Sequence, residues 1–241
     1  MKMALAGLAA ALLAAPASAQ KIEDSAALKP QADAMRRMWK LQPGKPAAMV
    51  IPLYGRVMRI DMPVGFVPAW KVEARGQFLF EFTEGDETVQ NWKRLITIRS
   101  AAGAGASTFD DAFIAEGLFR PTTCFAEPVY RVVERKDLGD GLSTIALTTG
   151  CGNVAGGRDG GEARGLGEID FIRMFRDKES VYSVAIAMRV KEYKADALPV
   201  SDAEALAALA AFKALLCKPD AAEGQCRDVV AIDRLRASQR R

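Results

Sequence analysis

Residues 107 to 151 read STFDDAFIAEGLFRPTTCFAEPVYRVVERKDLGDGLSTIALTTGC, and the rest of the chain can be interpreted around them. The first part of this stretch predicts a helix. Ser107 or Thr108 can cap it, because each is followed three residues later by an aspartate that suits the helix dipole. Gly117 and the Arg120-Pro121 pair are typical of a helix end. A helix is therefore expected between Ser107 and about residue 118.

A hairpin is expected next. Pro128 to Lys136 and Leu142 to Thr149 are rich in β-forming residues, and the glycine- and aspartate-rich segment from Asp137 to Gly141 separates them. The two cysteines of the stretch, Cys124 and Cys151, lie at either end of this hairpin. A disulfide between them would tie the helix exit to the far end of the hairpin.

The first 19 residues predict export. Lys2 provides a positive start, Met3 to Ala15 is apolar but too short to span a membrane, and Ala17-Ser18-Ala19 is a small-residue cleavage site. A buried N-terminal helix is the alternative interpretation. We expect cleavage after Ala19, and no integral membrane segment in the mature chain.

Composition excludes several classes of function. Loss of Lys2 with the leader lowers the formal net charge from +3 to +2, which argues against nucleic-acid binding as the main function. The chain contains no histidine, so Ser-His-Asp and Cys-His catalysis and His-ligated metal sites are excluded. Carboxylate, lysine, serine–lysine and tyrosine chemistry remain.

Four cysteines in an exported chain predict two disulfides. Four cysteines can form two disulfides in three ways. We favour disulfides between cysteines that are neighbours in sequence, namely Cys124–Cys151 and Cys217–Cys226. Free buried thiols are the alternative. No CxxC pair occurs, so neither redox nor zinc chemistry is indicated.

The remaining patterns are mostly strands, with helices near the two ends. Gln31 to Leu41 is compatible with a short helix in an N-terminal arm. The strand patterns are Ala47 to Pro63 as a hairpin, Trp70 to Phe82 as one strand bent at Gly76, Trp92 to Arg99, and Ile169 to Arg176 with Val181 to Val190 as a last hairpin. A capping box at Ser201 and Glu204 predicts a helix over Ala203 to Leu216, followed by a second short helix over Asp228 to Arg236.

One resemblance emerges from these patterns. The run Phe80-Glu81-Phe82-Thr83-Glu84-Gly85, followed by Asn91-Trp92, Cys124, Cys151, Gly167-Glu168 and Tyr182, resembles a group of uncharacterised secreted proteins of proteobacteria. The resemblance covers about residues 77 to 190. It implies an exported α+β domain and carries no known activity.

The glycine-rich segment from Gly150 to Gly167 includes Arg158 and Arg164. It lacks the Gly-Lys-Ser/Thr of a phosphate-binding loop, and a strand rather than a helix follows its glycines, so a mobile, solvent-exposed hairpin connection is the favoured interpretation. The carboxylates within and beside it could form an acid pair; these are Asp159, Glu162, Glu168 and Asp170. Ordinary surface carboxylates are the simpler interpretation.

We therefore expect an α+β fold: a largely antiparallel sheet with a central helix packed on it and a C-terminal helical pair. The expected organisation is a signal peptide (1–19), an N-terminal arm (20–46), an α+β domain (47–198) and a C-terminal helical segment (199–241). The expected function is that of a periplasmic or secreted, non-catalytic protein that binds an envelope partner or a small ligand. The alternative is a histidine-free hydrolase that uses a carboxylate pair. The sequence predicts no particular catalytic, cofactor-binding or metal-binding residue.

Overall fold

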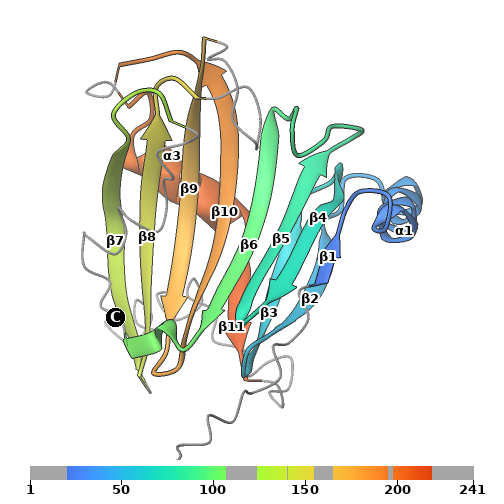
Figure 1. Cartoon of the computed structure of the whole chain (residues 1–241), viewed down its shortest axis with the longest axis horizontal. Coiled ribbons are helices and arrows are strands. Elements are labelled where there is room, and N and C mark those ends of the chain that lie inside the picture. The colour runs from blue at the N-terminus through green and yellow to red at the C-terminus, as the bar shows by residue number, and fades with distance from the viewer. Residues whose placement is uncertain (1–20, 107–123, 140, 155–164, 195–197, 219–241) are drawn as a thin grey trace, which may run out of the picture.

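A computed structural model describes residues 21–106, 124–139, 141–154, 165–194 and 198–218. Its main element is an eight-stranded antiparallel sheet with the order β1-β4-β5-β6-β10-β9-β8-β7 (Figure 1). The strands are β1 (Lys21–Glu23), β4 (Phe66–Ala74), β5 (Gln77–Glu84), β6 (Arg94–Ala102), β7 (Val129–Gly139), β8 (Leu142–Cys151), β9 (Leu166–Arg176) and β10 (Ser180–Lys191).

A smaller antiparallel sheet has the order β11-β3-β2. It consists of β2 (Ala47–Leu53), β3 (Arg56–Met62) and β11 (Ala214–Cys217). The strand β11 comes from the far end of the described chain and pairs with β3, with Leu216 opposite Met58. This sheet lies behind β5 and β6 in the view of Figure 1.

Two α-helices are described, together with the short 3-10 helix η1 (Ala104–Ala106). The helix α1 (Lys29–Leu41) has a proline in its first turn, where the missing N–H costs nothing, and it packs beside β4 and β2. The helix α3 (Asp202–Ala211) begins with the capping box formed by Ser201 and Glu204, and it packs on β7, β8 and β9. Neither helix is long and apolar enough to cross a membrane, within the part of the chain that the structure describes.

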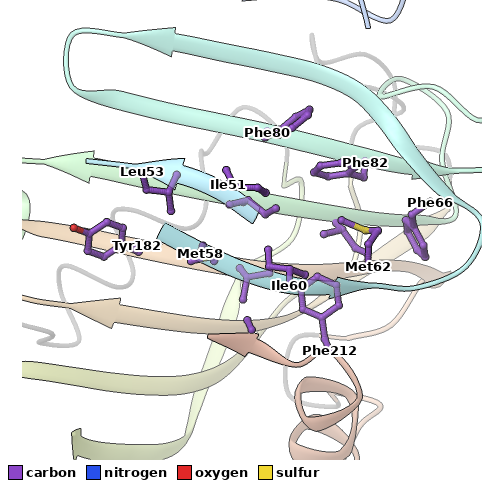
Figure 2. Close-up of a cluster of buried hydrophobic side chains, with 14 of the residues drawn as sticks. Ile51, Leu53, Met58, Ile60, Met62, Phe66, Phe80, Phe82, Tyr182 and Phe212 are labelled. Atoms are coloured by element: carbon purple, nitrogen blue, oxygen red, sulfur yellow. The ribbon is translucent and has the colours of Figure 1, made fainter. Parts of the chain in front are cut away.

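The hydrophobic core lies between the two sheets. Alternate residues of the large sheet, such as Phe80 and Phe82, meet Ile51, Met58 and Ile60 of the small sheet (Figure 2). On the same face of the large sheet, Ile169 and Phe171 pack against Ala205 and Leu209 of α3. We call this face the core face. The opposite face of the large sheet, here called the second face, carries a separate buried cluster that includes Leu147, Ile172 and Met174.

The predicted fold class is wrong. Strands make up 57% and helices 15% of the described residues, so the protein is mostly β rather than α+β. The central helix predicted from Ser107 lies outside the described residues. The α+β prediction gave too much weight to helical patterns at a few positions, whereas alternation of period two dominates the chain.

The prediction of a C-terminal helical pair is also wrong. The helix expected over Ala203 to Leu216 ends at Ala211, and Ala214–Cys217 forms the strand β11. Alanine and leucine favour a helix locally, but pairing with β3 buries Ala214, Leu216 and Cys217, and this tertiary contact overrides the local propensity. The second predicted helix, Asp228 to Arg236, lies outside the described residues.

The predicted strand from Trp70 to Phe82 is in fact a hairpin. The chain turns at Arg75 and Gly76, both with positive φ, and β4 pairs with β5 so that Val72 faces Leu79. Gly76 is therefore a turn residue and not a bend. The hairpins β7–β8 and β9–β10 are confirmed.

The Cys124–Cys151 disulfide is confirmed, with Cα atoms 5.8 Å apart. Cys217 is also disulfide-bonded. Its predicted partner, Cys226, lies outside the described residues. In the chain-entropy model, closing a loop of 27 residues contributes about 3–4 kcal/mol to stability.

Candidate functional site

Two carboxylates lie side by side on the second face of the large sheet. Glu168 and Asp170 are two residues apart on β9, so the alternation of a strand directs both side chains to one face. Glu168 lies between Cys151 of β8 and Arg189 of β10 in the strand register. Asp170 lies between Thr149 and Ala187 in the next row.

Arg189 connects Glu168 to an aromatic ring. Its Nη1 lies 3.1 Å from Oε2 of Glu168, and its guanidinium carbon lies 4.3 Å from the ring centroid of Trp92. The backbone N–H of Arg189 donates to the carbonyl of Lys93, which fixes the strand at this point. An arginine held by a carboxylate on one side and by an indole on the other has little rotational freedom.

Asp170 has a different set of partners. The hydroxyl of Thr149 donates to its Oδ2 over 3.0 Å. Burial raises the pKa of Asp170, although Thr149 and the charges of Arg99 and Arg189 oppose the rise.

The pKa of Glu168 is raised for two reasons, of which burial is the larger and the negative charge of Asp170 the second. Each of the two carboxyls therefore affects the ionisation of the other. Like charges this close cannot both ionise easily, so the pair retains a proton at pH values where ordinary carboxyls have lost theirs. The Glu168 side chain is still 21% exposed, so water can reach a group that the protein surrounds closely enough to desolvate.

A second arginine lies near the pair. Arg99 of β6 points to the second face, as its register with Ser183 shows, and its charge opposes the pKa shifts of both carboxyls. Arg99 is exposed, and the described residues provide it with neither a hydrogen bond nor an ion pair. We call Glu168, Asp170, Arg189, Arg99, Thr149 and Trp92 together the acid–arginine cluster.

The sequence predicted part of this cluster. The structure brings together two of the four carboxylates that were candidates for an acid pair, Glu168 and Asp170. The other two, Asp159 and Glu162, lie outside the described residues, as do Arg158 and Arg164. Sequence reasoning missed Arg189, Arg99 and Thr149, which lie on three other strands and could have been found only from the register of the sheet.

The ends of the glycine-rich segment pack against one aromatic ring. A Cβ atom at Gly150 would lie 2.2 Å from the Tyr193 hydroxyl, and one at Gly167 would lie 2.6 Å from Cε1 of the same ring. Tyr193 also donates a hydrogen bond from its hydroxyl to the carbonyl of Glu168 over 2.8 Å. These glycines therefore make room for Tyr193 behind the cluster. Both are buried residues of strands rather than of an exposed connection, and residues 155–164 of the predicted connection lie outside the described residues.

A third set of buried polar groups joins the two sheets. The Tyr182 hydroxyl donates to the carbonyl of Tyr54 over 2.6 Å, and the Nε of Arg56 donates to Asp177 over 2.8 Å. Burial opposes ionisation of Asp177, but hydrogen bonds from the backbone of Glu179 and Ser180 and from Arg56 lower its pKa overall. Every charge in this set has a partner, so we interpret it as structural.

Neither the possible metal ligands nor the comparisons with known proteins indicate a function. No group of three or more carboxylates or cysteines suited to a metal ion occurs among the described residues. Searches against protein-family models and against curated proteins found no match.

Proposed function

We propose that the protein is a non-catalytic binding protein, periplasmic or secreted, that holds a small ligand bearing a carboxylate or similar oxyanion at the acid–arginine cluster. The observation that supports this proposal is Arg99, an exposed cation on the same face, which makes no hydrogen bond or ion pair with the described residues. Its charge acts on a carboxyl pair that retains a proton. A guanidinium and a neutral carboxylic acid both donate hydrogen bonds, and an oxyanion accepts them.

The rigidity of the cluster supports binding over turnover. Glu168, Asp170 and Arg189 lie within paired strands, and Arg189 is held on two sides. Such a site is pre-organised, which reduces the entropy cost of holding a ligand. An envelope partner that presents a carboxylate would meet the same groups. Export of the chain is supported by its leader pattern, and the Cys124–Cys151 disulfide is compatible with an oxidising compartment.

Calorimetric titration of the purified chain with acetate, succinate and inorganic phosphate tests the proposal. We expect saturable binding of at least one anion, and Arg99→Ala should weaken it about tenfold or more, because a charge-assisted hydrogen bond is lost. Arg37→Ala is the matched control, since Arg37 is exposed on α1, away from the cluster. Absence of binding, or equal losses in the two variants, would exclude this site.

The carboxylate-pair hydrolase is the second candidate. The observation that favours it is the proton retained between Glu168 and Asp170, because one carboxylate can activate water while its protonated neighbour donates to a carbonyl oxygen. Turnover of labelled casein between pH 4 and 8 that is lost in Asp170→Asn would favour this candidate.

A further inference from the structure

One edge strand lacks the features that usually prevent strands from associating. Among the strands that the structure describes, β1, β7, β11 and β2 form the free edges of the two sheets. The strands β1 and β11 are short, with three and four residues. The strand β7 carries several charged side chains and is interrupted by irregular pairing between Val132 and Glu134. Short length, charge and bulges all protect edges.

The strand β2 has seven residues, Ala-Ala-Met-Val-Ile-Pro-Leu, none of which is charged. Its central residue, Val50, is 59% exposed. Pro52 protects one end of the strand, and the helix α1 packs beside β2.

The register shows which backbone groups of β2 point outward. A two-residue turn at Tyr54 and Gly55 joins β2 to β3, so Leu53 and Arg56 form a hydrogen-bonded pair. The alternate residues Pro52, Val50 and Ala48 therefore direct their backbone groups away from β3. Proline has no N–H, which explains why it is tolerated at one of these outward positions.

We propose that the outer edge of β2 is an interface at which two copies of this chain pair antiparallel about Val50. In this register the two Val50 residues exchange two hydrogen bonds. Ala48 of each copy lies opposite Pro52 of the other copy. The backbone N–H of Ala48 donates to the carbonyl of that Pro52, so the interface has four backbone hydrogen bonds. The missing N–H of each proline costs a single bond at each end.

The sequence of β2 favours a second copy over an unrelated segment. The pairing about Val50 opposes only uncharged residues along the whole strand, and the nearest charge, Lys45, faces Gly55 of the other copy. No like charges meet, and the result is a continuous six-stranded sheet that removes the β2 edge from solvent. This interface is independent of the acid–arginine cluster, which lies on the other sheet.

Sedimentation velocity of the purified chain over a wide concentration range tests the interface. We expect a monomer–dimer equilibrium, and Val50→Lys should abolish the dimer because it places two ammonium groups opposite each other. Val64→Lys is the matched control, since Val64 is also exposed but lies in the loop before β4. Unchanged thermal unfolding of Val50→Lys would show that the variant remains folded.

Cysteine substitution tests the register. Val50→Cys should give a disulfide-linked dimer on mild oxidation, because the two Val50 positions are directly opposite, whereas Ala48→Cys should not, because Ala48 faces Pro52. A chain that stays monomeric at all concentrations, a dimer that persists in Val50→Lys, or equal cross-linking of the two cysteine variants would overturn the proposal. The first result would leave the β2 edge to an extended segment of another protein.

Discussion

The Oε2 atom of Glu168 lies 3.1 Å from Nη1 of Arg189, directly across the ladder between β9 and β10. This ion pair coexists with a raised pKa of the same glutamate, because burial and the neighbouring Asp170 outweigh the arginine. The balance between desolvation and neighbouring charges therefore determines the pKa of Glu168 at the centre of the cluster.

The stability of the protein should fall as the pH rises from about 5 to about 8. The folded state raises the pKa of Glu168 from 4.5 to about 8 and also raises that of Asp170. A raised pKa means that the folded state binds the proton more tightly. This contribution is fully present below the unfolded value and is lost as the pH passes through the folded one. The replacements Glu168→Gln and Asp170→Asn together should flatten the slope in urea unfolding, whereas Glu127→Gln, at an exposed position, should not. An unchanged slope would contradict the burial of this pair.

Gly167→Ala should destabilise the fold by about 1–3 kcal/mol, because the new methyl group would overlap the Tyr193 ring. The control is the same substitution in a Tyr193→Ala background, where the ring is absent and the added cost should largely disappear. Chemical denaturation of the four proteins in this cycle measures the coupling. Additive effects of the two substitutions would show that the cost of Gly167→Ala does not come from overlap with the Tyr193 ring.

Tyr182→Phe should cost about 1–2 kcal/mol, because the carbonyl of Tyr54 loses its buried donor. The ring itself stays in the core cluster, so the change isolates the hydroxyl. Tyr130→Phe, at a more exposed tyrosine on β7, is the control and should have little effect. Equal unfolding free energies for Tyr182→Phe and the parent protein would show that the hydroxyl does not hold the two sheets together.

Export predicts a defined N-terminus. Cleavage after Ala19 would leave Gln20 as the first residue, immediately before β1. Intact mass of the protein recovered from the envelope fraction or the medium tests this prediction. A mature species that retains Met1 would exclude cleavage.

The sequence predicted local pairs of strands better than the overall fold. The hairpins β7–β8 and β9–β10 are visible in sequence because alternation and turn residues are local signals. Trp70 to Phe82 was misinterpreted because Gly76 suits both a bend and a turn. The Ala214–Cys217 strand was missed because its partner, β3, is remote in sequence. For the same reason, the carboxylates of the cluster could be predicted as candidates, but Arg189 and Arg99 could not be placed beside them.

The pairing of β11 with β3 also determines when the protein can finish folding. Residues near position 58 pair with residues near position 216. The smaller sheet therefore cannot form completely until almost the whole described chain has been synthesised. Contacts between such distant segments slow folding, and until they form the edge of β3 remains open to other chains. A chain shortened before Ala214 should thus behave as an aggregation-prone intermediate, and a factor that shields β3 during synthesis or transport would raise the yield of native protein.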